Sequence, residues 1–184
     1  MKMQTEPSVI DVPLIVLRAA DDRIEGKTVL QKLSYFLAVR TGLQLGFAPH
    51  FYGPFSRQLE GAVDTLTFSG ILSESTVQHG VNASGWPVRE TTYELTPEGT
   101  EFADLVFDKH AGLASECREL VAALKKWDPS LNQKPLSLAA KVHFLSKGEK
   151  LSPEAFRRAA REVGWELDDA EVESALALLS QLDL

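Results

Sequence analysis

Four residues near position 56 are of the types that read DNA from the start of a helix. Arginine can pair with the edge of a guanine, glutamine can pair with an adenine, and a serine hydroxyl can contact a phosphate. A helix that enters the major groove meets the base edges with the exposed side chains of its first turns. The residues expected to contact DNA in this way are Ser56, Arg57, Gln58 and Gly61. Glu60 and Asp64 share the exposed side, where they would face a polyanion.

Basic residues in neighbouring segments could add contacts with the DNA backbone. Lys27, Lys32 and Arg40 belong to the preceding predicted helix, and Arg89 and His79 belong to a predicted hairpin tip. Useful affinity for DNA usually rests on about six or more phosphate contacts. One copy of the chain barely provides that number, whereas a symmetric dimer would double it.

Two other features are of the kind that contacts proteins. Trp86 falls at the hairpin tip, where a tryptophan could anchor a partner protein or fold back onto the strands. Three arginines are spaced to lie on one side of a predicted helix, namely Arg157, Arg158 and Arg161. They could hold an acidic partner or a phosphate backbone, or they could form a solvated face opposite Phe156.

Residue types that support catalysis or bind metals are not grouped in the sequence. The residues Gly-Lys-Thr at 26–28 resemble the end of a phosphate-binding loop, but that motif needs a glycine where Asp21 stands. The four histidines fall in separate predicted elements, and no Cys-x-x-Cys, His-Glu-x-x-His or Gly-x-Ser-x-Gly is present. Cys117 lies beside Glu116 and Glu119. Neighbouring carboxylates raise the pKa of a thiol, so a buried or inert thiol is expected rather than a nucleophile. We therefore expect no catalytic residue, no metal and no cofactor.

The composition is that of a folded protein with an acidic balance. The chain has 184 residues, 44% of them hydrophobic, and its net charge is −7. Residues 1–72 carry seven positive and seven negative groups, residues 73–128 carry five and ten, and residues 129–184 carry seven and nine. This acidity counts against a protein that mainly binds phosphates. A single cysteine, no apolar run of about 18 residues and no apolar leader predict a cytoplasmic protein.

Apolar periodicity and cap residues predict the elements that position these side chains. The predicted helices span residues 8–21, 27–42, 56–70 and 96–127, and the predicted strands span 71–77 and 88–95. Ser56 is the expected N-cap of the third helix, whose apolar stripe is Leu59, Val63 and Leu66. The segment IEGKT, residues 24–28, is expected to be a short connector between the first two helices.

The fourth helix carries an apolar seam with two possible uses. Its residues follow one another at spacings of four, three and four, and they are Leu113, Cys117, Leu120 and Leu124. Such a seam suits a partner helix. It could join two chains in a homodimer through residues 97–127, or it could pack against the protein's own core.

The chain divides into two predicted parts. Residues 8–127 are expected to form a mainly α domain with a small β-hairpin, and residues 128–135 have the composition of a linker. Residues 136–184 are expected to form a helical module of three short helices. Two of these helices have clear N-caps, at Ser152 and at Asp168.

The order of helix, helix, extended segment, helix, strand, loop, strand and helix is that of a winged helix-turn-helix domain. The segments GKTVLQKLSYFLAVRTG, HFYGPFSRQLEGAVDTLTFSGIL and YELTPEG resemble the YwgA-like bacterial winged-helix family. The shorter motifs LQKLSYF and YGPFS are similar, more distantly, to antitoxin domains of the Panacea and SocA type. The C-terminal segment VGWELDDAEVESALALLSQLDL also fits the YwgA-like pattern, so the resemblance covers nearly the whole chain.

Two functions follow as expectations from these residues and from the resemblance. The fold of the resembled family implies nucleic-acid binding by analogy, so the first is a sequence-specific, DNA-binding transcriptional regulator without enzymatic activity. The resemblance to antitoxin domains implies binding to a toxin protein. The alternative is therefore an antitoxin-like or adaptor module that binds a partner protein and no DNA.

Overall fold

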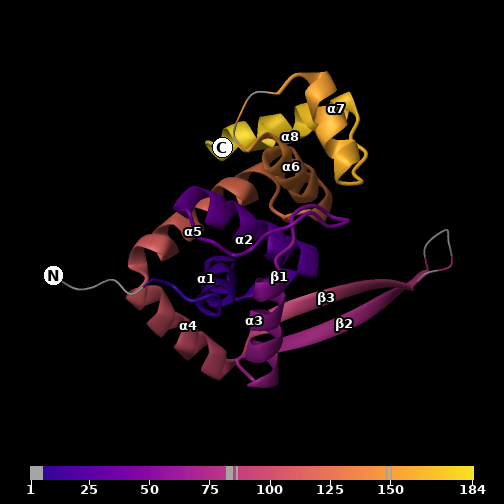
Figure 1. Cartoon of the computed structure of the whole chain (residues 1–184). Coiled ribbons are helices and arrows are strands. Elements are labelled where there is room, and N and C mark those ends of the chain that lie inside the picture. The colour runs from indigo at the N-terminus through magenta and orange to yellow at the C-terminus, as the bar shows by residue number, and fades with distance from the viewer. Residues whose placement is uncertain (1–5, 82–84, 86, 148, 150) are drawn as a thin grey trace.

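The computed structural model describes residues 6–81, 85, 87–147, 149 and 151–184 (Figure 1). The first elements are α1 (Asp11–Ala19), β1 (Arg23–Glu25), α2 (Lys27–Thr41) and α3 (Arg57–Phe68). The next are β2 (Leu72–Val81), β3 (Pro87–Leu95), α4 (Pro97–Lys109) and α5 (Ala111–Trp127). The last are α6 (Gln133–Ser146), α7 (Pro153–Glu162) and α8 (Asp169–Gln181). None of the helices in the described ranges is both long and apolar enough to cross a membrane.

The architecture is mainly helical with a small antiparallel sheet, which confirms the predicted fold class at that level. The helix ends follow the caps expected from the sequence. The Ser56 hydroxyl accepts a hydrogen bond from the amide three residues later at 3.0 Å, and the Thr96 hydroxyl accepts one from the Gly99 amide at 3.0 Å. Asp168 and Glu171 form a reciprocal capping box at the start of α8. The predicted starts of α3, α4 and α8 are therefore confirmed.

A third strand joins the sheet where the sequence predicted only a connector. β1 pairs with β3, with Ile24 opposite Tyr93, and the strand order is β1-β3-β2. The chain turns into β1 through Asp21 and Asp22, both at positive φ, and Arg18 holds the Asp22 carboxylate at 2.9 Å. Three residues are too few to show strand alternation in a sequence, so this strand depends on its pairing with β3.

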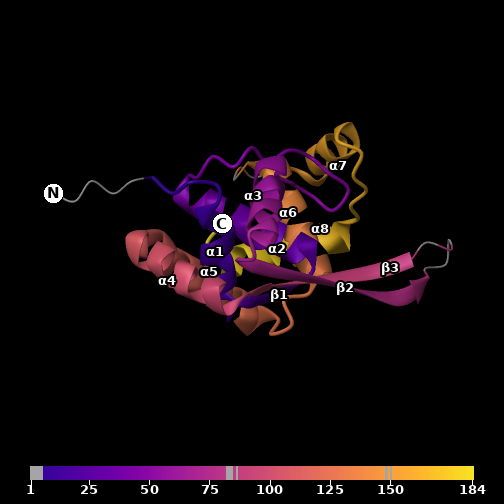
Figure 2. The same cartoon turned by 90° about the horizontal axis from the view of Figure 1, so that it is seen from below.

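β2 and β3 form a long hairpin that projects away from the helices (Figures 1 and 2). Its base is anchored in the core, where Leu72 lies opposite Leu95 and both side chains are buried. Farther out, most side chains of both strands are exposed. Trp86 falls outside the described residues, so its predicted place at the tip stays a prediction.

The helix predicted between Thr96 and Trp127 is two helices, α4 and α5, which meet at His110. His110 leaves helical geometry at φ −115° and ψ 44°. Its buried side chain places Nε2 at 3.3 Å from Asp11 Oδ2 at the start of α1. The break lets both helices pack against α1. Tertiary contact thus overrides the helical propensity of the continuous segment.

The apolar seam of α5 is buried in the protein's own core. Cys117 and Leu120 are fully buried, Leu124 is nearly so, and Leu113 packs at the edge of the core. α5 packs against α1, α2 and α4. Of the two uses left open by the spacing, the structure has the internal one. A homodimer stays a prediction that would need another surface.

The C-terminal helices are joined to the rest of the molecule through α6. This helix begins at Gln133, inside the segment predicted as a linker, and packs against both α2 and α8. Its Leu136 and Ala139 belong to the same apolar core as α2. Ser152 caps α7 as expected, with its hydroxyl accepting from the Ala155 amide at 3.2 Å. In Figure 1, α7 and α8 lie at the opposite end of the molecule from α4.

The start of α4 approaches Ile71, which lies between α3 and β2, so closely that only glycine fits at position 99. A Cβ at Gly99 would overlap the Ile71 carbonyl oxygen, which already accepts a hydrogen bond from the Thr96 amide at 3.1 Å. We expect Gly99→Ala to lower the free energy of unfolding by about 2 kcal/mol, because the backbone must shift to relieve the overlap.

The matched control is Gly61→Ala in α3, where a Cβ would meet nothing within 4 Å. It should raise the free energy of unfolding by about 0.5–1 kcal/mol, since alanine favours helix over glycine. Urea unfolding followed by circular dichroism measures both variants. Equal stability changes in Gly99→Ala and Gly61→Ala would contradict a steric overlap between a Cβ at position 99 and the Ile71 carbonyl oxygen.

Candidate functional site

The two motifs LQKLSYF and YGPFS, far apart in the sequence, meet in the structure. The Gln31 side chain makes two hydrogen bonds with the backbone of Ser56. Its Nε2 donates to the Ser56 carbonyl at 3.0 Å, and its Oε1 accepts from the Ser56 amide at 2.9 Å. The Lys32 ammonium donates to the Pro54 carbonyl at 2.8 Å. Consecutive side chains of α2 therefore hold the turn that leads into α3.

The same turn is also packed against the C-terminal helices. Gly53 has φ +100°, and a Cβ there would lie 3.3 Å from Lys32 Cε and 3.2 Å from Lys141 Cγ of α6. The Trp165 indole, which follows α7, donates to the His50 carbonyl at 2.7 Å. The buried Trp165 ring also lies 5.5 Å from the Lys141 ammonium. The turn is thus fixed from both sides, by α2 and by the C-terminal helices.

A pocket of about 430 Å³ opens between this turn, the first half of α2 and the start of α3. We call it the α2–α3 pocket. It is lined by Lys27, Thr28, Gln31, Lys32, His50, Tyr52, Phe55, Arg57 and Glu60. Three of the residues predicted to bind DNA therefore meet here: Lys27, Lys32 and Arg57. The lining holds three cationic side chains against one carboxylate, although the whole chain has a net charge of −7.

Lys32 is the unusual residue of this pocket. Only 1% of its surface is exposed, and none of the ion pairs among the described residues involves it. Burial, with a smaller contribution from nearby Lys141, lowers the pKa of Lys32 from 10.5 to about 8. The sequence carried a signal for this burial. Lys32 lies three residues after Val29 and four before Phe36, on the apolar face of α2.

The structure corrects two of the predicted DNA contacts. Ser56 is fully buried, and its hydroxyl donates to the Leu45 carbonyl while it caps α3, so it cannot reach a phosphate. Lys32 is buried beneath the Pro54 carbonyl, so it does not reach the molecular surface where a DNA backbone would lie. Both residues serve the attachment of the turn, which their polar side chains did not reveal in the sequence.

Two further predicted contacts are engaged in ion pairs. Lys27 pairs with Glu60 across the α2–α3 pocket. Arg40, near the other end of α2, lies 3.2 Å from Glu116 and 4.0 Å from Glu119 on α5. The structure therefore brings Lys27 to the start of α3 but keeps Arg40 away from it.

The remaining predicted DNA contacts are exposed beside an acidic surface. Arg57, Gln58 and Gly61 are exposed on α3, and Arg89 is exposed on β3. Between α3 and the sheet, three carboxylates act on the buried Tyr93 ring, namely Glu74, Asp64 and Glu60. Burial and these charges raise the pKa of Tyr93 to about 12. The face made by α3 and the hairpin is therefore acidic near its centre.

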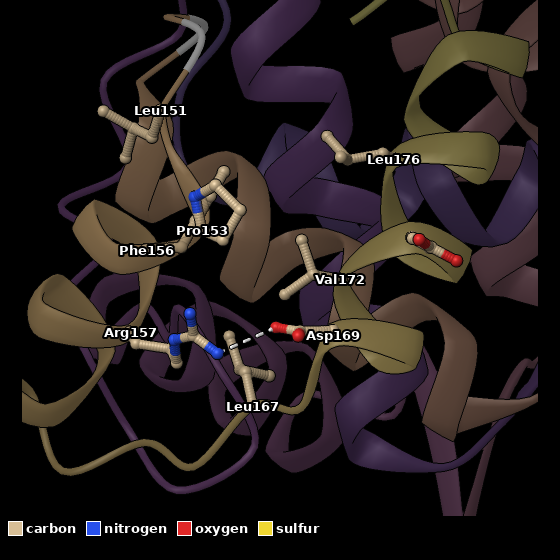
Figure 3. Close-up of a pocket in the computed structure, with 9 residues that line it drawn as sticks. Leu151, Pro153, Phe156, Arg157, Leu167, Asp169, Val172 and Leu176 are labelled. Carbon is tan, nitrogen blue, oxygen red and sulfur yellow. Dashed lines mark hydrogen bonds and ion pairs between the residues drawn. The ribbon is translucent and has the colours of Figure 1, made fainter.

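The arginines predicted to bind a partner lie on α7 with different surroundings. Arg157 bridges to Asp169 of α8 at 3.3 Å, as Figure 3 shows, and lies 3.5 Å from Glu154. Arg158 and Arg161 are exposed. The Arg157–Asp169 pair lines a pocket of about 240 Å³ whose other walls are largely apolar: Leu151, Pro153, Phe156, Leu167, Val172 and Leu176, with Glu173.

The described residues place no group of three histidine, cysteine, aspartate or glutamate side chains where they could hold a metal ion. Cys117 is buried, as the sequence suggested, and burial raises the pKa of its thiol to about 12. His143 Nδ1 lies 2.8 Å from the Tyr35 hydroxyl, and burial lowers the pKa of His143. These two rings join α6 to α2.

The buried lysine predicts a pH-dependent stability. The pKa of Lys32 is about 8 in the folded chain and near 10.5 in the unfolded one, so between these values the unfolded chain binds more protons. Wild-type stability then rises with pH over that range, as the folded-state lysine becomes neutral. Lys32→Met removes the titrating group, and we expect it to raise the free energy of unfolding at pH 7 by about 2 kcal/mol.

This advantage of Lys32→Met should shrink by about 2 kcal/mol between pH 7 and pH 9.5, because only the wild type gains stability there. Urea unfolding at both pH values measures it. The matched control, Lys126→Met, removes an exposed lysine of α5 and should show no such change. An advantage that is constant with pH would contradict a lowered pKa of Lys32.

In comparisons with known proteins, no protein-family model matches this chain, and no curated protein matches it significantly. The resemblance seen in the motifs of α2 and α3 therefore stays a prediction from sequence. The contacts between those motifs are what the structure adds to it, because residues of LQKLSYF hold the backbone of YGPFS.

Proposed function

We propose that this chain is a non-enzymatic protein-binding module on a winged-helix framework, of the antitoxin or adaptor type. The order α1-β1-α2-α3-β2-β3, with β1 beside β3, supports the winged-helix framework, in which α3 and the hairpin form the recognition face. This proposal takes the alternative of the two functions expected from the sequence. A cytoplasmic location remains part of the proposal.

The charge of the recognition face is the observation that carries this choice. Asp64 and Glu74 lie near Tyr93 between α3 and the hairpin, where a DNA backbone would come close, and nearby Glu60 is paired with Lys27. Carboxylates in that position repel phosphates, and a chain of net charge −7 has no excess of cations to offset them. Of the basic residues on α2, Lys27 and Arg40 are already paired with carboxylates.

The exposed side of α3 also has an apolar end suited to a protein contact. Asp64 and Phe68 follow Gly61 on the solvent side of the helix, and Phe68 is 96% exposed. An exposed aromatic ring beside charged residues is typical of surfaces that bind proteins. A partner with an apolar pocket and basic neighbours would complement this face.

DNA binding by a transcriptional regulator remains a second candidate, favoured by one observation. Arg57, Gln58 and Gly61 are exposed in the first turns of α3, where a recognition helix meets base edges. Affinity for DNA would then need more cations than one chain exposes there. A homodimer that presents Arg57 and Arg89 twice would supply some of them.

The proposal predicts weak DNA binding without sequence preference. In fluorescence anisotropy, the wild type should bind a random duplex and the DNA upstream of its own gene equally weakly, and neither at near-physiological salt. Neutralising Glu60→Gln, Asp64→Asn and Glu74→Gln together should strengthen binding at low salt, because phosphates are no longer repelled. Preference for the upstream DNA that survives the higher salt and is lost in Arg57→Ala/Gln58→Ala would instead support the regulator.

The protein-binding face makes a second prediction. A partner cross-linked to the tagged wild type in its native cells and then purified should bind Phe68→Ser at least tenfold more weakly, since the exposed ring is lost. The matched control is Leu176→Ser, which removes an exposed apolar side chain from α8 at the far end of the molecule. Unchanged affinity of Phe68→Ser, or equal losses in both variants, would rule out the α3 face as the binding surface.

A further inference from the structure

We infer that the α2–α3 pocket binds a small planar ligand that carries an oxyanion, either a carboxylate or a phosphate group. This ligand site goes beyond the proposed protein-binding face and does not depend on it. The inference rests on three independent features of the pocket: a buried cation without a counter-ion, further cations at the opening, and an aromatic wall of suitable size.

The buried cation is Lys32. Its ammonium has three N–H donors, and the Pro54 carbonyl accepts from one of them. Buried charges in proteins are paired with an opposite charge, because burial without a partner is costly. Among the described residues no carboxylate pairs with Lys32, and Lys141 adds a second positive charge nearby. An oxyanion in the pocket would supply the missing negative charge.

Further cations stand around the opening of the pocket. Arg57 is exposed on its lining and has no ion pair among the described residues, and its planar guanidinium suits two-point binding of a carboxylate or phosphate. Lys27 also lines the pocket and is paired with Glu60, the one carboxylate of the lining. Both Lys27 and Thr28 belong to the first turn of α2, whose N-cap Gly26 offers no side-chain acceptor. The positive end of that helix adds to the attraction of an anion.

The other walls suit a flat ring. His50 and Phe55 pack against each other, with ring centroids 4.9 Å apart and an angle of 31° between the rings, and Tyr52 also lines this side. Aromatic side chains bind planar groups by stacking. The volume of about 430 Å³ lies within the usual range for small-molecule sites, roughly 300–1,000 Å³.

The pocket between α7 and α8 lacks these features, which makes the contrast informative. It is smaller, at about 240 Å³, and its one cation, Arg157, already has Asp169 as a partner. No cation of its lining is left without a carboxylate partner. An unpaired buried cation therefore distinguishes the α2–α3 pocket from the pocket between α7 and α8.

Isothermal titration calorimetry of the full chain at pH 7 tests the inference. The probes are adenosine monophosphate and phenylacetate, which differ in their oxyanion, with adenosine and inorganic phosphate as their incomplete counterparts. We expect at least one of the two aromatic anions to bind tenfold or more tightly than adenosine and inorganic phosphate. An aromatic anion can contact both the cations and the aromatic side chains of the pocket, whereas each incomplete counterpart can contact only one of the two. Failure of both aromatic anions to bind would overturn the inference.

Variants then place the binding. Lys32→Met and Arg57→Gln should each weaken the better probe at least tenfold, whereas Lys126→Met, which removes an exposed lysine of α5, should bind it as the wild type does. Arg57 is exposed, so Arg57→Gln tests the site without the change in stability that we expect for Lys32→Met. Binding that neither variant weakens would show that the anion lies elsewhere.

Proton uptake gives a readout that a merely structural lysine would not produce. A bound anion keeps Lys32 charged, so binding at pH 8.5 should take up a fraction of a proton, and affinity should fall between pH 7 and pH 9.5. The charged groups around it are Lys141 on α6 and Lys27, Arg57 and Glu60 on the lining. The apparent binding enthalpy in buffers of different ionisation enthalpy measures the uptake. Uptake that persists in Lys32→Met, or no uptake in the wild type, would contradict a site at Lys32.

Discussion

The attachment of the Pro54–Ser56 backbone to α2 is the interaction on which the arrangement of this protein depends. Residues 42–56 link α2 to α3 without a helix or a regular strand, so their position is set by side-chain contacts and by the backbone bridge between Ala48 and Phe55. Gln31 and Lys32 provide those contacts from consecutive positions, and both are buried. Because Ser56 is also the cap of α3, the same contacts fix where that helix begins and which of its side chains face the solvent.

Structure that is set by neighbouring residues could be predicted from the sequence, and structure that is set by distant residues could not. Caps and apolar stripes are local signals, so the starts of α3, α4 and α8 followed from residues such as Ser56 and Thr96. β1 and the break at His110 are set by contacts with β3 and α1, which lie far away in the sequence. No window of a few residues contains those partners. The sequence therefore predicted the helices better than the way they meet.

The candidate site was the harder part, because one residue type can serve opposite purposes. Lys32 and Ser56 looked like phosphate contacts by their chemistry, yet both hold backbone groups inside the molecule. Periodicity would have placed Lys32 on the apolar face of α2, since it lies between Val29 and Phe36. Its partner is the backbone carbonyl of Pro54, and the type of residue at position 54 gives no sign of this contact. Spacing was therefore enough to place the lysine in the core, although the sequence prediction assigned it to DNA, and only the fold revealed its contact.

Burying the charged Lys32 costs more free energy than one hydrogen bond to a carbonyl oxygen returns. A methionine has similar length and would fill the same space without the cost of burying a charge, and an apolar residue in such a place is often more stable than an ion. What the lysine adds beyond packing and one hydrogen bond is positive charge. The positive charge stabilises the structure only if a negative group binds next to it. The α2–α3 pocket, which Lys32 lines, has room for such a group. On this reasoning, the residue that fastens the turn is also the one that makes the pocket selective for anions.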